Sequence, residues 1–289
     1  MPPSATPSSV CSSVSTSFSE PHHEGKAERQ IAFVLGCARS GTSILGELIG
    51  AHPVVAYLFE AHGVWEPPGS PPPDHHRLTA SDAKPAVVER VRRRLLAKAG
   101  HGRVVVEKNP RHALRVPFLR AAFPEAVFIH VVRDGRDVAC SMLPGVGGED
   151  WWHLRPPDWR EHFERAEGLR RCAFAWRGVM EIVLEDLAAV PALEVRFERL
   201  VRAPERTAQE VLSFLGLASD PAVEAFCTRV SDDTAAPYHS DSRKWFRGDH
   251  QVRVGRWREY ARERPVEMAQ AESIMHDVLV RLGYEPELS

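Results

Sequence analysis

Gly36-Cys-Ala-Arg-Ser-Gly-Thr-Ser43 is the stretch that decides the fold, because it separates two apolar segments of different kinds. The run before it, Ile31-Ala-Phe-Val-Leu35, predicts a buried strand, and the run after it, Ile44-Leu-Gly-Glu-Leu-Ile49, predicts a helix. A glycine-rich turn between a strand and a helix offers backbone N–H groups and the positive end of the helix dipole to an anion. The sequence therefore predicts a phosphate-binding turn at residues 36–43.

The composition of this turn narrows the choice of ligand. The P-loop of nucleoside triphosphatases has a lysine after its second glycine, which reaches the β- and γ-phosphates, and a hydroxyl that holds Mg²⁺. Here Gly41 is followed by Thr42 and Ser43, and the only cation of the turn is Arg39. We therefore expect a nucleotide without a triphosphate, and we expect no metal.

A second segment repeats the strand, turn and helix pattern. Phe128-Ile-His-Val-Val132 predicts a strand, and it is followed by Arg133-Asp-Gly-Arg-Asp137 and by the helix start Val138-Ala-Cys-Ser-Met142. Arg133 and Ser141 are eight positions apart, so a guanidinium at the strand end and a hydroxyl inside the helix can meet one further anion. Two phosphate sites at neighbouring strand ends suit a 3′,5′-bisphosphorylated adenosine.

Together these two motifs resemble the sulfotransferase family, and the tyrosylprotein and bacterial branches are the nearest in pattern. One shared detail is Arg39, where the cytosolic small-molecule branch carries lysine and the tyrosylprotein branch carries arginine. The resemblance covers about Ile31 to Trp257. Further matches occur in the family's order at His52-Pro53, Glu60, Glu107-Lys-Asn-Pro110, Phe197-Glu-Arg-Leu200, Phe214-Leu-Gly216 and Gly255-Arg-Trp257.

The resemblance implies the donor 3′-phosphoadenosine 5′-phosphosulfate (PAPS) and the product adenosine 3′,5′-bisphosphate (PAP). In this family the 5′-phosphosulfate sits in the first turn, and the 3′-phosphate meets the arginine and serine of the second motif. The C-terminal segment resembles the one that wraps the 3′-phosphate, although a tryptophan at a helix start is more often part of the core. The expected donor-binding residues are Gly36, Cys37, Ala38, Arg39, Ser40, Gly41, Thr42, Ser43, Arg133, Ser141, Arg253, Gly255, Arg256 and Trp257.

Sulfuryl transfer to a hydroxyl needs a base for the acceptor proton and cations at the oxygens that gain charge. Glu60 is the expected base, because it lies 21 positions after Arg39, the offset of the catalytic glutamate in the tyrosylprotein branch. Lys108 follows the strand at 104–106 and, with Arg39, is expected to stabilise the leaving group. His62 is an alternative base, and His52, directly before a proline, fits a structural role at the end of the helix.

The whole chain fits a single α/β domain with a P-loop-like parallel sheet and helices on both faces. We expect strands near 31–35, 104–106, 127–132 and 192–196, and helices near 43–51, 85–99, 111–122, 136–142, 160–188, 204–215 and 266–282. Residues 1–29 are rich in Ser, Thr and Pro, which predicts a disordered tail before a sulfotransferase domain at 30–289. Two proline- and glycine-rich stretches, 67–73 and 144–152, predict surface loops. Trp151 and Trp152 in the second are read either as part of a lid or as anchors.

Composition sets the expected partners and compartment. The 289 residues carry a formal net charge of −2, which gives no electrostatic footprint for nucleic acid or an anionic membrane. No stretch reaches the length of a membrane span, and five scattered cysteines suit a reducing compartment, so we expect a cytoplasmic protein. We expect the acceptor to be a hydroxyl group on a small molecule, sugar, lipid or tyrosyl side chain. The sequence does not distinguish among these acceptors, and it does not give the oligomeric state.

Two other functions remain open at this stage. The first is a P-loop kinase or related nucleotide-dependent transferase, which is disfavoured because the lysine and an aspartate pattern for Mg²⁺ are missing. The second is a nucleotide-binding protein that keeps the fold without turnover.

Overall fold

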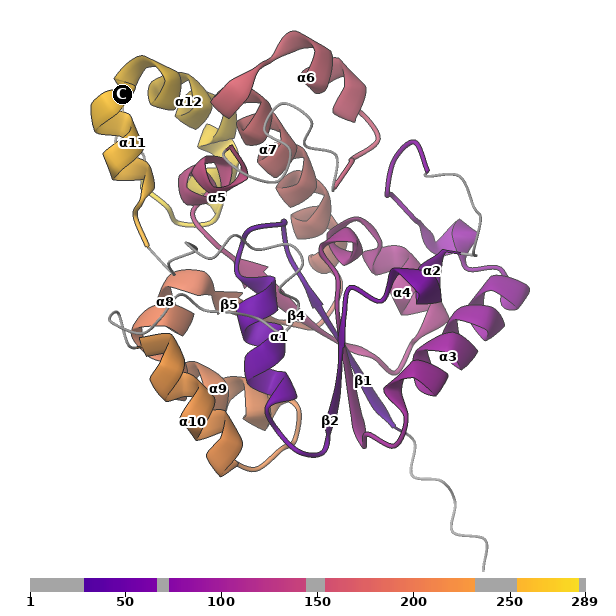
Figure 1. Ribbon diagram of the computed structural model, residues 1–289. Helices are drawn as coiled ribbons and strands as arrows, with labels where there is room; N and C mark the ends of the chain where they lie inside the picture. The colour runs from indigo at the N-terminus through magenta and orange to yellow at the C-terminus, as the bar shows by residue number, and fades with distance from the viewer. Residues whose placement is uncertain (1–28, 67–72, 144–153, 232–253, 286–289) are drawn as a thin grey trace, which may run out of the picture.

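A parallel sheet forms the centre of the molecule (Figure 1). The computed structural model describes residues 29–66, 73–143, 154–231 and 254–285. Within these ranges five strands pair in the order β2-β3-β1-β4-β5, and every pair is parallel. The strands are β1 (Gln30–Leu35), β2 (Val55–Phe59), β3 (Val104–Lys108), β4 (Val127–Val132) and β5 (Ala192–Arg196).

Helices cover both faces of the sheet, so the predicted α/β class with one domain is confirmed (Figure 1). The α-helices are α1 (Thr42–Gly50), α2 (His62–Trp65), α3 (Pro85–Ala99), α4 (Val116–Ala122), α5 (Gly135–Met142), α6 (Trp159–Arg165), α7 (Gly168–Leu187), α8 (Phe197–Arg202), α9 (Pro204–Phe214), α10 (Pro221–Ser231), α11 (Trp257–Glu263) and α12 (Pro265–Arg281). Two 3₁₀ turns, η1 (Ala80–Asp82) and η2 (Pro110–Leu114), complete the described elements.

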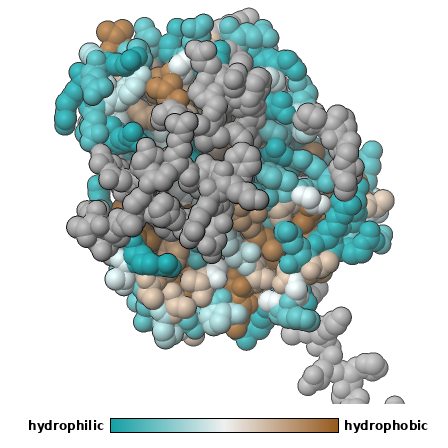
Figure 2. Space-filling model, viewed as in Figure 1, coloured by the Kyte–Doolittle hydropathy of each residue, from teal (hydrophilic) through white to brown (hydrophobic). Residues whose placement is uncertain are grey.

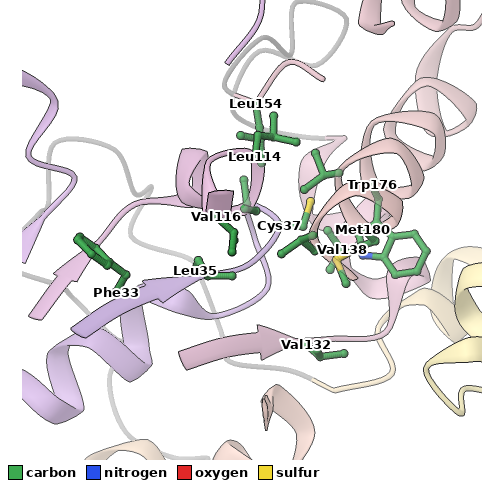
Figure 3. Close-up of a cluster of buried hydrophobic side chains, with 14 of the residues drawn as sticks. Phe33, Leu35, Cys37, Leu114, Val116, Val132, Val138, Leu154, Trp176 and Met180 are labelled. Carbon is green, nitrogen blue, oxygen red and sulfur yellow. The ribbon is translucent and has the colours of Figure 1, made fainter. Parts of the chain in front are cut away.

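The sheet separates two apolar cores. Alternate residues of β1 point to opposite faces, as a strand requires. Ile31 and Phe33 pack with α3, α4, α7 and α12, whereas Ala32 and Val34 pack with α1, α8, α9 and α10. Figure 3 shows part of the first core, where Leu35, Val132 and Trp176 lie near the ends of β1 and β4. The described surface seen in Figure 2 is mainly hydrophilic along its upper and right edges.

The structure differs from the sequence-based elements in several places, and it adds four helices that were not predicted, α2, α8, α10 and α11. Strand β2 was not predicted, although all five of its residues are apolar; it lies at the sheet edge, where most of them are only half-buried. The helix expected at 111–122 is divided into η2 and α4, because Pro117 lacks the backbone N–H of a continuous helix. The helix expected at 160–188 is divided into α6 and α7, where Ala166 is extended and Gly168 has φ +53°.

Several sequence expectations concern residues outside the described ranges. They include the tail before residue 29, most of the stretch 67–73, and the loop with Trp151 and Trp152. Trp159 is described: it begins α6, and its ring contacts the guanidinium groups of Arg155 and Arg160.

The parallel arrangement also determines where a ligand can bind. In open α/β sheets, ligands bind outside the carboxyl ends of the strands. Glu60 follows β2, Lys108 ends β3, the turn at 36–41 follows β1 and Arg133 follows β4. These four strands are neighbours in the sheet, so the expected site residues share one edge.

We predict opposite effects of an added methyl group at two helical glycines. Alanine in place of glycine usually stabilises a helix by about 0.5–1 kcal/mol. A Cβ atom at Gly46 in α1 would lie 2.5 Å from the buried Tyr57 hydroxyl, whereas at Gly63 in α2 it would meet nothing within 4 Å. Gly46→Ala should therefore lower the free energy of unfolding by about 1–3 kcal/mol, the range for overpacking. Gly63→Ala should leave it unchanged or raise it.

Urea-induced unfolding of both variants measures this difference. Equal stability of Gly46→Ala and Gly63→Ala would show that α1 and β2 do not pack as closely as described.

Candidate active site

The turn at residues 36–41 has the backbone of an anion cradle. Arg39 and Gly41 both have positive φ, 71° and 92°, and α1 begins immediately afterwards at Thr42. A side chain at Gly41 would meet the Phe197 ring at 2.3 Å, and one at Gly36 would meet the carbonyl oxygen of Val131 at 2.5 Å. Glycine at these two positions therefore allows the turn to lie directly against β4 and the start of α8.

The two predicted phosphate motifs meet at Arg39. Its Nε donates to the Ser141 hydroxyl at 3.2 Å, and Nη1 of Arg133 donates to the Arg39 carbonyl oxygen at 3.1 Å. Burial, followed by the nearby charge of Arg133, lowers the pKa of Arg39 to about 10, so it remains charged at neutral pH. The Arg133 guanidinium lies 4.1 Å from the centre of the Phe197 ring. Arg39 and Arg133, which are 94 positions apart in the sequence, thus form one positively charged site.

Most of the other side chains of the turn are buried beneath it. Ala38, Ser40 and Thr42 are buried and Ser43 is half-buried. Cys37 is fully buried with Val138 and Met180 in the cluster of Figure 3, and burial raises the pKa of its thiol. Cys37 therefore packs under the turn as a small apolar side chain and is no reactive thiol.

The C-terminal segment reaches the second motif through Asp137. This carboxylate accepts the backbone N–H groups of Gly255 at 2.7 Å and Trp257 at 3.0 Å, and it lies 3.6 Å from Nη2 of Arg133. Trp257 is buried beneath the Arg136 guanidinium, so its side chain belongs to the core, whereas Arg256 is exposed. Arg253 lies outside the described residues.

The predicted base and the predicted lysine form an ion pair. Nζ of Lys108 lies 2.6 Å from Oε1 of Glu60, and Nε2 of His62 lies 3.6 Å from Oε2. The Lys108 side chain is only 1% exposed, and its ammonium lies 3.9 Å from the centre of the Phe59 ring. Burial lowers the pKa of Lys108, and the charge of Glu60 acts against this shift.

Glu60 is ionised at neutral pH. Burial alone would raise its pKa, but the interaction with His62 and the charge of Lys108 outweigh burial and lower the pKa to about 2. Its backbone has φ +40°, a conformation that costs a non-glycine residue roughly 1–3 kcal/mol and occurs preferentially at functional sites. His52, in contrast, is buried away from this pair and accepts the backbone N–H of Val54, which fits its structural role.

The sequence reasoning did not assign roles to Asp137 or Glu107. Both stood inside quoted motifs, but nothing in their spacing shows that their carboxylates accept backbone N–H groups from distant segments. Glu107 is fully buried and accepts the N–H of Ala61, the residue after Glu60, at 3.1 Å.

The residues expected to bind the donor have the charge and the hydrogen-bonding groups that suit an anionic nucleotide. The guanidinium groups of Arg39 and Arg133 lie close enough in a buried site for the charge of Arg133 to contribute to the lowered pKa of Arg39. The hydroxyl oxygen of Ser40 in the turn is buried, with no hydrogen-bond partner within the described ranges. Such a site favours a ligand with more than one negative charge and several acceptor oxygens.

The fold and this site define a P-loop-like α/β protein with buried cations gathered at one sheet edge. Residues 32–221 match the model of the sulfotransferase family. The chain belongs to this family and is a sulfotransferase.

The chain is also similar in sequence to individual sulfotransferases and related proteins. Protein-tyrosine sulfotransferase 1 of Danio rerio is 23% identical over 275 residues, which cover 89% of this chain and 72% of the relative. Nodulation protein NoeE of Sinorhizobium fredii is 29% identical over 220 residues, which cover 66% of this chain and 51% of the relative.

Solved structures share the fold. The sulfotransferase domain from the curacin biosynthetic pathway superimposes with a TM-score of 0.57 at 16% identity, over 89% of this chain and 98% of the domain. A mouse sulfotransferase complexed with PAP superimposes with a TM-score of 0.51 at 16% identity, over 89% of each chain. In the described part of this chain, no group of His, Cys, Asp or Glu side chains forms a metal site, and no helix is long and apolar enough to cross a membrane.

The depressed pKa of Glu60 predicts how stability depends on pH. Since its folded pKa of about 2 lies below the ordinary value of 4.5, the ionised carboxylate stabilises the fold above about pH 4.5. This contribution is lost as the pH falls toward 2. Wild type should therefore be more stable than Glu60→Gln at pH 6, and the difference should shrink steadily below pH 4.5.

Denaturant unfolding of both proteins from pH 6 to the lowest pH at which they remain folded measures this difference. A difference that stays constant as the pH falls would contradict the ion pair.

Proposed function

We propose that this sulfotransferase transfers the sulfuryl group of PAPS to an acceptor hydroxyl, with Glu60 as the base. The observation that carries the proposal is the placement of two charge clusters on one sheet edge. Arg39, Arg133 and Ser141 form the first, and Glu60 and Lys108 form the second. The proposal gives the first cluster to the donor nucleotide and the second to the reacting groups.

Donor binding is divided between the two motifs. The turn at 36–43 binds the 5′-phosphosulfate through its backbone N–H groups and Arg39. Arg133 and Ser141 bind the 3′-phosphate, for which Arg133 supplies charge-assisted hydrogen bonds. Gly255 and Arg256 lie beside this second site because Asp137 binds the Gly255 N–H and lies near Arg133. The complex of PAP with a mouse sulfotransferase of the same fold supports this choice of nucleotide.

The transfer is an in-line displacement at sulfur. The acceptor oxygen forms a bond to sulfur, and its proton passes to the Glu60 carboxylate. The bond between sulfur and the bridging oxygen breaks, and its electron pair leaves with PAP. Lys108 and Arg39 stabilise the negative charge that develops on the leaving group, where buried cations act most strongly.

The contact between Lys108 and Glu60 links the departure of the leaving group to the removal of the acceptor proton. While His62 and the Lys108 ammonium both interact with Glu60, they lower its pKa to about 2, so the carboxylate is a weak base. As charge develops on the leaving oxygen, the ammonium interacts with that oxygen instead. The basicity of Glu60 then rises when the acceptor proton has to be removed.

The acceptor is proposed only as a class, a hydroxyl of a small molecule, sugar, lipid or tyrosyl side chain. The relatives named for protein-tyrosine sulfation support a phenolic hydroxyl, so simple phenols are the first acceptors to test.

We predict that PAP stabilises the chain without Mg²⁺ and that Arg133 contributes to its affinity. Loss of hydrogen bonds to a charged group costs about 1.5–3 kcal/mol, or roughly 10- to 150-fold in affinity. Arg133→Ala should show this loss in calorimetric titration with PAP. Arg92→Ala, which removes an arginine that pairs with Glu125 on another part of the surface, should bind PAP like the wild type.

Thermal shift assays with PAP and with Mg·ATP separate the alternative functions. Stabilisation by Mg·ATP alone would indicate a kinase-like protein and would overturn the assignment. Unchanged PAP affinity in folded Arg133→Ala would remove Arg133 from the 3′-phosphate site.

We predict that Glu60→Gln lowers kcat/KM by about 10²–10⁴-fold, the usual contribution of a general base. The loss should be largest for phenols of high pKa and smallest for acidic phenols that are already partly ionised. PAP affinity should be retained, because other residues form the donor site. His62→Gln is the matched control, since it changes the neighbouring side chain and leaves the carboxylate in place.

Steady-state kinetics over a series of phenols of graded pKa provides the measurement. If His62→Gln loses activity in this pattern and Glu60→Gln does not, His62 is the base.

A further inference from the structure

Glu107 is a buried carboxylate that neither the donor site nor the reacting pair uses. Its Oε1 accepts the backbone N–H of Ala61 at 3.1 Å and the indole N–H of Trp65 at 3.4 Å. Its Oε2 is in hydrogen-bond contact with Nε2 of His112. All four residues are buried, and Glu107 and His112 are completely so.

The hydrogen bond to Ala61 acts on the turn that carries Glu60. The N–H of Glu60 donates to the carbonyl oxygen of Lys108 at 2.8 Å, and the next N–H, of Ala61, donates to the Glu107 side chain. Between these two bonds, the backbone of Glu60 has φ +40°. Two successive residues of β3 thus bind the two peptide groups on either side of the strained residue.

Lys108 and Glu107 are neighbours on β3, so their side chains reach the turn at Glu60 from opposite faces of the strand. Successive side chains of a strand point to opposite faces. The Lys108 ammonium contacts the Glu60 carboxylate, whereas the Glu107 carboxylate binds the backbone behind it. We propose that Glu107, supported by His112, is a positioning residue that holds the Glu60 carboxylate in the orientation for proton removal. This inference rests on the proposed role of Glu60 as the base.

A carboxylate is an unusual choice for this place. The surroundings include the rings of Phe33, Trp65 and His112, with Phe33 and His112 centroids 5.1 Å apart. Burying a charge in such surroundings is unfavourable unless it is fully hydrogen-bonded, and an apolar residue would fill the space without that cost. What an apolar residue cannot do is accept the N–H of Ala61.

The test compares Glu107→Met with Glu107→Gln. Methionine keeps the volume and removes both acceptor oxygens, so the turn loses its hydrogen bond and Glu60 can move. A displacement of about 1 Å at a reacting group can cost about 10²-fold. Glu107→Met should therefore lower kcat/KM by about 10- to 100-fold for phenols of high pKa, and by less than about threefold for the most acidic phenols, with PAP affinity unchanged. Glu107→Gln keeps one acceptor oxygen and should lose less.

Trp65→Phe is the matched control. It removes the indole donor to Glu107 from the same buried cluster and leaves the bond to Ala61 intact. Its rates should stay close to wild type at every acceptor pKa.

A loss of rate that is the same for all phenols, or an equal loss in Trp65→Phe, would show that Glu107 only stabilises the fold and would overturn the proposal. If Glu107→Met does not fold, Glu107→Gln should still show a smaller loss confined to phenols of high pKa, and a loss that is equal for all phenols, or no loss, would overturn the proposal. Failure of the proposed role of Glu60 is distinguishable, because Glu60→Gln would then keep its rates with the same series of phenols.

Discussion

The parallel direction of the strands is the constraint on which the rest of this structure depends. Because β1 to β4 are neighbours and run the same way, the residues that follow each strand gather at one edge without any long excursion of the chain. A reversed strand would carry Lys108 or Arg133 to the opposite end of the sheet. The two apolar cores maintain this direction, since each face of β1 is packed against its own group of helices.

Buried charge is the second theme of the molecule. Lys108, Arg133, Arg136, Glu107 and Asp137 are all largely withdrawn from water. Each lies against an opposite charge or a set of N–H donors, as buried ions require. Buried charges in this arrangement are little screened by salt, so they act at full strength on a nearby ligand.

The sequence patterns predicted the fold class, and they predicted that most of the main candidate site residues follow neighbouring parallel strands. The strong apolar runs of β1, β3 and β4 lie at the centre of the sheet, where every residue faces a core, and glycine-rich turns follow β1 and β4. Strand β2 was missed although its five residues are apolar, whereas β5, the other edge strand and no more buried, was predicted. The pairing of Glu60 with Lys108 and the bond from Ala61 to Glu107 depend on side-chain geometry across two strands. No local pattern encodes such contacts, so Glu107 appeared in the sequence only as a neighbour of Lys108.

The hydrogen bonds from the backbone N–H groups of Gly255 and Trp257 to Asp137 connect the C-terminal segment to the rest of the domain. The family model stops at residue 221, yet Asp137 takes its two backbone partners from beyond that point. Helix α12 also lies beyond residue 221, and it belongs to the central core. Its residues Met268, Ala271, Met275 and Leu279 are fully buried together with Phe33 and Trp176. A chain cut at residue 221 would expose this core and leave the Asp137 carboxylate without those donors. The segment matched by the family therefore leaves out part of the apolar core and both backbone partners of Asp137.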